Sequence, residues 1–280
     1  MNENIFSRIP EARKITSRTN PLIVSLSKLQ QTKYRREQKM YLAEGVKLSR
    51  EAAGMAEVRY VLVQSEDGAV EQEVLEIAAA CPEHGNVLVL PESVFQKIST
   101  ENAPQGIITV LAFQENIHID WTAEAASETD GQRLLLVDSV RDPGNLGTMI
   151  RTAAAFGFDR ILVSGCADLY HPKTVRASMG ALYRTRIALC ENLAQAIASL
   201  QAGGHRVLAA ALDEKSLTLG KDPIFPDDCI VIGNEGHGVS LQVLSAADAV
   251  VKIPMEPDAE SLNAAGAAAV LMWEYYRAFS

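Results

Sequence analysis

The chain has 280 residues, of which 48% are hydrophobic and 22% charged, a globular composition that is long enough for one large or two ordinary domains. Its 26 Lys and Arg against 35 Asp and Glu give a formal net charge of −9, which taken alone argues against a nucleic-acid partner. The charge is uneven, however, because residues 1–50 hold 11 basic and 4 acidic residues (+7) and the remainder holds 15 and 31 (−16). The first fifty residues are therefore the candidate for binding an anionic partner.

Membrane and secreted classes are also disfavoured. Residues 1–18 lack the apolar core of a secretory signal, and the longest apolar run, 264–273, is about half as long as a membrane-spanning helix. We therefore expect a cytoplasmic protein with no membrane partner. No Cys-x-x-Cys pair occurs, so free thiols are expected in place of a zinc site or a disulfide framework at Cys81, Cys166, Cys190 and Cys229.

The first part of the chain alternates predicted helices and strands. A basic helix is predicted over 21–37, with Asn20 as its cap. Short apolar runs at 60–63, 87–90 and 106–111 have the pattern of strands. This alternation predicts a small α/β domain.

A linker is predicted where the composition changes. Residues 114–132 are dominated by Glu, Asp, Ser, Thr and Gly. We therefore divide the chain into a first domain over 1–115, a linker over 116–131 and a second domain over 132–280.

The second domain is predicted to be a parallel α/β sheet. Near-continuous apolar runs at 134–137, 161–163, 207–210 and 230–232 are typical of strands buried on both faces, with helices between them, one of them over 146–156. Such sheets bind ligands at the carboxyl ends of their strands.

The first polar motif, D-P-G-N-L-G-T-M-I-R, spans 142–151 and follows the first of these strands. Asn145 stands where a helix N-cap is expected, and its amide could equally face a ligand. Arg151 is the only charged residue between 143 and 158, and its guanidinium is expected to extend back past Gly147 toward the 142–145 turn, because helical side chains lean toward the N-terminus. The alternative is a solvent-facing arginine on an amphipathic helix.

The second motif, I-V-I-G-N-E-G-H-G, spans 230–238. Its glycines let the backbone pass close to a ligand. Glu235 is the only charged residue between 229 and 247, which suggests a contact to a cation, a ribose hydroxyl or an arginine. The alternative is a glycine-rich turn with an exposed glutamate, and His237 is expected in a solvated turn.

The third motif is I-P-M at 253–255, followed by E-S-L-N-A-A-G-A-A-A-V-L-M-W from 260 to 273. Ser261 is the expected N-cap, and the small residues that follow permit close packing on another helix or on a second subunit. Ordinary capping is the alternative explanation for Ser261 and Asn263. The sequence contains no Walker loop, no dinucleotide fingerprint and no metal-ligand pairing.

In this order the three motifs resemble the SpoU (TrmH-type) branch of the SPOUT RNA methyltransferases, over essentially all of 132–280. The segment H-P-K-T-V-R-A-S-M-G-A-L-Y-R, 171–184, also fits that family's pattern. One departure is Ala264-Ala265-Gly266, where Val-Ser-Val commonly follows the Asn of the third motif. The basic start resembles the RNA substrate-binding domain, of a ribosomal-protein type, that many members carry ahead of the catalytic domain.

The resemblance implies a deep trefoil knot, a homodimer and S-adenosyl-L-methionine as the methyl donor. It implies transfer to a ribose 2′-hydroxyl of structured RNA without a metal, with 23S ribosomal RNA favoured over transfer RNA. The donor would be contacted by the backbone around Gly233, Ile253 and Leu262, together with Asn234 and Gly236.

The resemblance also implies site roles. Arg151 would activate the hydroxyl, and Asn145, Glu235, Ser261 and Asn263 would hold it, the nucleotide and the donor in register. A guanidinium is a poor base, so we weight orientation and charge stabilisation at least equally with proton abstraction. Phosphate contacts would come from the basic residues, namely Lys33, Arg35, Arg36, Lys39, Lys173 and Arg176, with Arg184 and Arg186.

Three other interpretations stay open at this point. One is a transfer-RNA methyltransferase, and another is a non-catalytic RNA-binding or ribosome-assembly protein that kept the fold. The third is a nucleotide-dependent enzyme on an ordinary doubly wound sheet, which the missing phosphate fingerprint disfavours.

Overall fold

A computed structural model describes residues 3–81, 83–118, 121, 126, 129, 131–213, 216–256, 258 and 261–279. The chain forms two compact units, one from 1–114 with 170–183, the other from 115–169 with 184–280. The first unit thus includes a segment from the later part of the chain. Most of the predicted linker, 116–131, lies outside the described residues.

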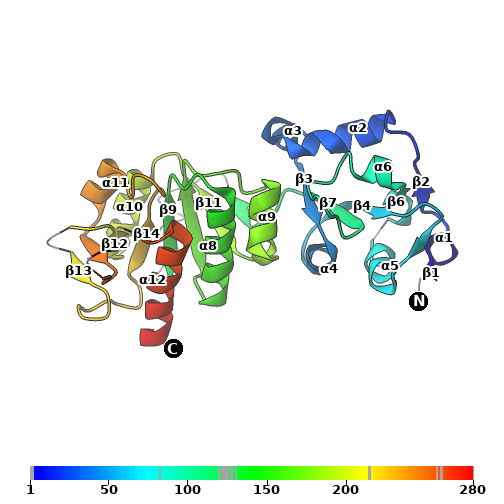
Figure 1. The fold of residues 1–280 in the computed structure, drawn as a ribbon. Helices are drawn as coiled ribbons and strands as arrows, with labels where there is room; N and C mark the ends of the chain where they lie inside the picture. The colour runs from blue at the N-terminus through cyan, green and yellow to red at the C-terminus, as the bar shows by residue number, and fades with distance from the viewer. Residues whose placement is uncertain are drawn as a thin grey trace. The chain divides into compact units, whose positions relative to one another are not determined.

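The first unit is built on a mixed five-stranded sheet in the order β2-β6-β4-β7-β3 (Figure 1). Strands β2, β6 and β4 run parallel, and β7 is antiparallel to both β4 and β3. A separate ribbon pairs β1 (Glu3–Asn4) with β5 (Ala69–Val70). The five strands are β2 (Arg13–Lys14), β3 (Met40–Glu44), β4 (Val58–Gln64), β6 (Val87–Leu90) and β7 (Ile107–Ala112). The strands expected at 60–63, 87–90 and 106–111 are confirmed as β4, β6 and β7.

Short helices cover both faces of this sheet. Because successive side chains of a strand point to opposite faces, Val61 and Val63 pack with α1 (Ile5–Arg8) and α5 (Gln72–Ala79). Leu62 packs on the other face with α2 (Pro21–Ser27), η1 (Lys28–Gln30) and α6 (Glu92–Phe95). The other helices described in this unit are α3 (Thr32–Gln38), α4 (Val46–Met55), η2 (His84–Asn86), α9 (Pro172–Ser178) and η3 (Ala181–Tyr183).

The single basic helix predicted over 21–37 is wrong. The segment forms α2 (Pro21–Ser27), η1 (Lys28–Gln30) and α3, with Gln31 extended between the last two at φ −103° and ψ 134°. The carbonyl of Leu29 accepts a 2.7 Å hydrogen bond from the buried guanidinium of Arg35, which stabilises this turn. The predicted cap is confirmed, since Oδ1 of Asn20 accepts from the N–H of Leu22 at 2.9 Å.

The second unit is a parallel sheet of eight strands in the order β13-β15-β12-β14-β9-β10-β11-β8. The four strands predicted from the sequence are its central four, and the outer four were not predicted. The α/β class is therefore confirmed, with strands β8 (Ile117–His118), β9 (Leu134–Asp138), β10 (Arg160–Ser164), β11 (Arg186–Leu189), β12 (Val207–Ala210), β13 (Leu217–Thr218), β14 (Cys229–Ile232) and β15 (Ala249–Lys252).

Helices cover both faces of this sheet as well. Leu134, Leu136 and their neighbours pack against α10 (Leu193–Ala202) and α11 (Leu241–Ala246). On the other face, α8 (Pro143–Ala155) packs against α12 (Ala264–Phe279), as Figure 1 shows. Both α8 and α12 begin close to the carboxyl ends of the central strands, where they can contribute to a site.

Two expectations about the whole chain concern cysteines and membranes. All four cysteines are free, and burial raises the pKa of Cys166 and of Cys190 to about 12. Among the described residues, no helix combines the length and the apolar character needed to cross a bilayer.

Candidate functional site

A cavity of about 480 Å³ opens at the carboxyl ends of three neighbouring strands, β15, β12 and β14. Its walls come from the residues after β12 (210–212), the loop after β14 (232–239), the end of β15 (251–255) and the start of α12 (261–267). This is the place where parallel α/β sheets bind ligands, and the volume is that of a small-molecule site.

The loop after β14 is held shut by its own hydrogen bonds. The N–H groups of Asn234 and Gly238 donate to each other's carbonyl oxygens, at 2.8 and 2.9 Å. Oδ1 of Asn234 accepts from the N–H groups of Gly236 (2.9 Å) and His237 (3.2 Å), while its Nδ2 donates to the carbonyl of Ser139 (2.8 Å). The loop is therefore a rigid wall of the cavity.

Gly233 is required by this closure. A Cβ atom added there would lie 2.1 Å from the nitrogen of Val239 and 2.2 Å from the carbonyl carbon of Gly238. Both are backbone atoms that cannot move aside without opening the loop. The glycine predicted to let the backbone pass close to a ligand thus lets the two ends of the loop meet.

The end of β9 supports the same loop. Asp138 is buried, and its Oδ2 accepts from the N–H of Ser240 at 2.8 Å, just after the loop. Ser139 adopts a left-handed backbone conformation with φ 59°, which is uncommon for a residue other than glycine. Backbone strain of this kind is typical of functional sites, and here it aims the Ser139 carbonyl at Asn234.

A chain of side-chain hydrogen bonds joins three of the predicted catalytic residues. Oε1 of Glu235 accepts from Nδ2 of Asn145 at 2.9 Å, and Oδ1 of Asn145 accepts from Nδ2 of Asn263 at 3.1 Å. The carboxylate also accepts from the backbone N–H groups of Arg141 and Asp142, both at 3.1 Å. The loop after β14 is thereby tied to the starts of α8 and α12.

The carboxylate fixes the orientation of both amides. An ionised carboxylate only accepts hydrogen bonds, so Asn145 must turn its NH₂ group toward Glu235 and its oxygen toward Asn263. Asn263 then donates with its own NH₂ group and keeps its oxygen for the N–H groups of Ala265 (2.9 Å) and Gly266 (3.2 Å). One charge therefore sets the direction of the whole chain of bonds.

Glu235 is held in its ionised form. Partial burial raises its pKa, but the hydrogen bonds from Asn145 and from the backbone of Arg141 and Asp142 favour the carboxylate, and the net result is a pKa below the ordinary value of a glutamate. The carboxylate acts here as a structural anion at the cavity mouth.

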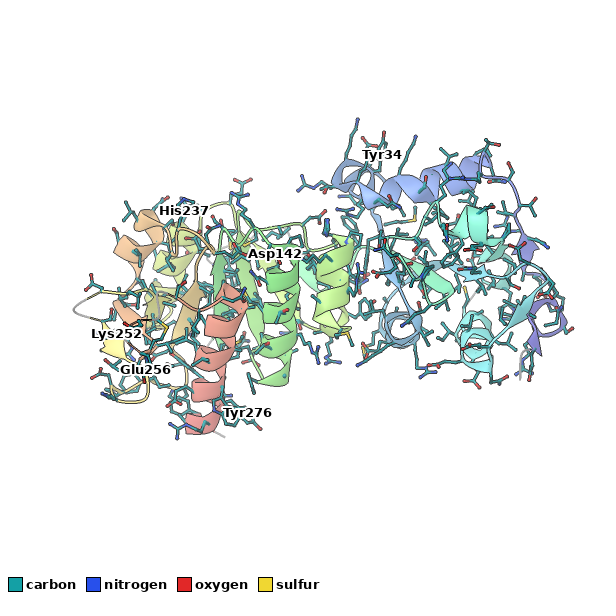
Figure 2. All side chains as sticks on the ribbon, viewed as in Figure 1. Tyr34, Asp142, His237, Lys252, Glu256 and Tyr276 are labelled. Carbon is teal, nitrogen blue, oxygen red and sulfur yellow. The ribbon has the colours of Figure 1, made fainter. Side chains whose placement is uncertain are left out.

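Two predicted caps are wrong. Asp142, labelled in Figure 2, caps α8, because its Oδ1 accepts from the N–H of Asn145 at 2.9 Å and Pro143 occupies the first helical position. Asn145 is the third residue of the helix, in its first turn, and its side-chain amide is not used for capping but donates to Glu235. At α12 the cap is Asn263, while Ser261 is exposed and lines the cavity. An Asp-Pro pair before an apolar helix is the signal that could have identified the first cap.

The predicted donor-binding residues gather around one cavity. Gly233, Asn234, Gly236, Ile253 and Leu262 all line it. His237 also lines it and is exposed in its turn, as labelled in Figure 2. Their roles toward a ligand stay predictions.

Arg151 is exposed on α8. Within the described parts of the chain, no hydrogen bond or ion pair joins its guanidinium to another residue. Its extension toward the 142–145 turn stays a prediction.

The predicted phosphate contacts divide into two groups. Lys33, Arg36, Lys39 and Lys173 are exposed. Arg35 is completely buried, where it donates to Leu29 and Thr32, so the prediction that it contacts RNA is wrong. Arg176 is half-buried and pairs with Glu101.

Among the described residues, no three His, Cys, Asp or Glu side chains are grouped as metal ligands. The site instead offers a closed glycine loop, a partly apolar cavity and a row of amides of fixed direction.

Comparison with known proteins identifies two domain types. The SpoU rRNA methylase family matches residues 132–273, and the MRM3-like substrate binding domain matches residues 20–109. The 23S rRNA (guanosine(2553)-2′-O)-methyltransferase RlmP of Bacillus subtilis is 31% identical over 263 residues, which are 93% of this chain and 98% of that protein.

Two solved structures are similar to this chain over nearly its whole length. An AdoMet-bound rRNA methyltransferase from Sinorhizobium meliloti is 29% identical and superimposes with a TM-score of 0.82, covering 96% of this chain and 99% of that one. A putative RNA methyltransferase of the TrmH family from Porphyromonas gingivalis is 31% identical with a TM-score of 0.76, covering 91% and 97%.

Proposed function

This chain belongs to the SpoU rRNA methylase family, and we propose that it methylates a ribose 2′-hydroxyl of ribosomal RNA. It is an RNA methyltransferase that uses S-adenosyl-L-methionine. The observation that carries the finer proposal is the match to an rRNA 2′-O-methyltransferase over nearly the full length of both chains, including the substrate-binding half.

The cavity fits the methyl donor. Ile232, Ile253 and Leu262 offer an apolar wall for an adenine, and the closed loop starting at Gly233 brings backbone close without a side chain in the way. When bound, S-adenosyl-L-methionine supplies an electrophilic methyl group. The residues that would hold it are Gly233, Asn234, Gly236, Ile253 and Leu262, all of which line the cavity.

The remaining residues prepare the acceptor. Arg151 has an unoccupied guanidinium that can donate to a ribose hydroxyl and stabilise negative charge on its oxygen. Because the group is exposed, the hydroxyl proton can pass to water. Asn145, Glu235 and Asn263 keep the starts of α8 and α12 in register, and Ser261 lies at the cavity wall within reach of a bound ligand.

A homodimer is part of the proposal. The face of α12 leaves Trp273 48% and Tyr276 39% exposed, and the two rings lie 5.7 and 5.5 Å from that of Phe156. Tyr276 is labelled in Figure 2. Such an aromatic patch on one helix face suits a self-complementary contact. Sedimentation of wild type against Trp273→Ser tests it, with a monomeric wild type as the contradicting result.

The function is tested by transfer of labelled methyl groups to separated 23S rRNA, 16S rRNA and tRNA. We expect label in 23S rRNA, recovered after nuclease digestion as a 2′-O-methylated nucleoside. Label confined to tRNA would overturn the rRNA assignment, and label on a base would overturn the ribose assignment.

A further inference from the structure

The first unit contains a cleft of about 550 Å³ that the site above does not use. It lies at one end of the five-stranded sheet, because the strand directions bring the starts of β3, β4 and β6 and the end of β7 to the same edge. Its walls combine cations, aromatic rings, amides and the carboxylate of Glu57, and the residues used below are Lys39, Arg59, Tyr60, Asn86 and Phe113.

Lys39 is held at the cleft in a strained conformation. It ends α3 with φ 53° and ψ 37°, a left-handed geometry that favours glycine, and it is exposed. Its carbonyl accepts from the N–H of Phe113 at 2.9 Å, and its ammonium lies 5.5 Å from the centre of the Phe113 ring. A glycine would relieve the strain, so the lysine side chain itself is the feature that needs a role.

Phe113 presents a fixed aromatic surface. Its ring stacks on Tyr170 with centres 4.0 Å apart and planes at 17°, and Tyr170 in turn contacts Tyr41 at 4.6 Å. The hydroxyl of Tyr170 accepts from the N–H of Gln114 at 2.9 Å, which fixes the stack from the other side. Phe113 is half-buried and lines the cleft.

Positive charge leads to this cleft. Lys33 and Arg36 of α3 and Lys39 at its C-cap follow each other at intervals of three residues and are exposed, with Lys33 3.9 Å from Glu37. Arg59 also lines the cleft, but it pairs with Glu57 at 2.9 Å, so the unpaired charge here, within the described part of the chain, comes from Arg36 and Lys39. A row of cations that ends at an aromatic ring matches a nucleotide strand, in which phosphates bind the cations and a base stacks on the ring.

We propose that this cleft binds one unpaired nucleotide of the RNA substrate, with its base against Phe113 and its phosphate against Lys39. The nucleotide must be unpaired because a ring recessed in a cleft cannot reach a base inside a duplex. This inference rests on the proposed function, in which the first unit holds the RNA.

The experiment compares two fluorescent RNA probes on the full-length protein: a hairpin with a seven-nucleotide loop, and a blunt duplex with the same stem. Loss of one base stack in Phe113→Leu should raise the hairpin Kd by roughly tenfold, with the duplex Kd unchanged. Phe113→Tyr keeps the ring and should bind as wild type does. Lys39→Gly should lower the slope of log Kd against log salt by about 0.7, the value for one phosphate contact in a single strand.

Controls separate the cleft from general charge and from folding. Lys47→Ala removes an exposed lysine of α4 in the same unit and should leave both Kd values unchanged. Lys39→Gly removes a strained residue, so its unfolding temperature should not fall. Equal losses for hairpin and duplex, or an unchanged hairpin Kd in folded Phe113→Leu, would overturn the proposal. Methyl transfer by the wild type is measured separately from RNA binding. If the wild type transfers methyl groups but RNA binding does not depend on Phe113, the cleft proposal fails and the proposed function stands.

Discussion

Nδ2 of Asn145 donates a 2.9 Å hydrogen bond to Oε1 of Glu235, joining two residues that stand 90 positions apart in the sequence. The bond connects the first turn of α8 to the loop after β14, and Asn263 extends the connection to α12. These hydrogen bonds therefore fix the position of the cavity wall relative to α8, the helix that carries Arg151. A substitution at Asn145, Glu235 or Asn263 should displace the other two residues.

Replacing Glu235 by Gln should damage the site although size and shape are kept. In the wild type both carboxylate oxygens accept hydrogen bonds from N–H groups. In Glu235→Gln an NH₂ group replaces one of these oxygens, so it faces an N–H donor and both are left without an acceptor. An unsatisfied donor costs about 1–3 kcal/mol, so turnover should fall by roughly 5- to 150-fold. Glu191→Gln, at an exposed position after β11, is the matched control and should be silent. Normal turnover in Glu235→Gln would contradict the constraint.

Acid should weaken the hydrogen bonds that Glu235 accepts, because these bonds favour its ionised form. The folded-state pKa of Glu235 is lowered, so its stabilising contribution is complete above the ordinary glutamate value of about 4.3 and is lost as the pH falls through the lowered value. The amide signals of Arg141 and Asp142, which donate to the carboxylate, should report this in an NMR titration. A midpoint at or above the ordinary value would show that the bonds do not favour the ionised form.

Gly233→Ala should open the loop after β14. Its Cβ would lie 2.1 Å from the nitrogen of Val239, and overpacking of this kind costs about 1–3 kcal/mol of folding stability. We expect loss of S-adenosyl-L-methionine binding in calorimetry and a lower unfolding temperature. Gly266→Ala, where an added Cβ meets nothing within 4 Å, is the control and should unfold no earlier than wild type. Unchanged donor affinity in Gly233→Ala would separate the loop closure from the donor site.

Asn263 has two roles that substitutions can separate. Asp keeps the oxygen that caps α12 but removes the NH₂ group that donates to Asn145, whereas Ala removes both. Asn263→Asp should therefore keep wild-type stability and lose turnover, while Asn263→Ala should also lose about 1 kcal/mol of stability. Denaturant unfolding and methyl transfer, measured on the same samples, decide this. If Asn263→Asp, Asn263→Ala and the wild type had equal turnover, the hydrogen bond from Asn263 to Asn145 would not contribute to catalysis.

Arg151→Ala should abolish turnover and spare donor binding. Loss of one group that stabilises developing negative charge costs about 10²- to 10³-fold in rate. Arg151→Lys keeps the charge but not the planar fork, so an intermediate rate is expected. Single-turnover methyl transfer with donor affinity measured in parallel provides the test. Near-normal rates in Arg151→Ala would remove this residue from the mechanism.

The sequence predicted the strands that are buried on both faces and missed the others. The central strands β12, β14, β9 and β10 are nearly continuous apolar runs, so their pattern is unambiguous. Outer strands such as β11 and β15 mix polar with apolar residues and pair only because the sheet already exists. Local pattern cannot report that dependence.

The sequence indicated candidate site residues but not the contacts that they make. The glycines after β14 and the polar motif residues are visible as isolated features of an apolar sequence. The glycines line one cavity together with Glu235 and Ser261, and hydrogen bonds connect Asn145 and Asn263 to Glu235. Which residue caps which helix depends on one-residue differences in where each helix starts, and Arg35 is buried only because the chain turns at Gln31. Both follow from tertiary packing, which the sequence pattern does not specify.

The segment 170–183 belongs to the first unit although it is flanked on both sides by the second. The polypeptide therefore passes from one unit to the other three times, after 114, 169 and 183. Proteolysis within 115–131 would leave a nicked protein whose later fragment still carries a piece of the earlier unit, including the Tyr170 ring on which Phe113 stacks. Deletion of residues 1–110 would equally strip that piece of its packing partners, so no single cut of the backbone divides this chain into its two units.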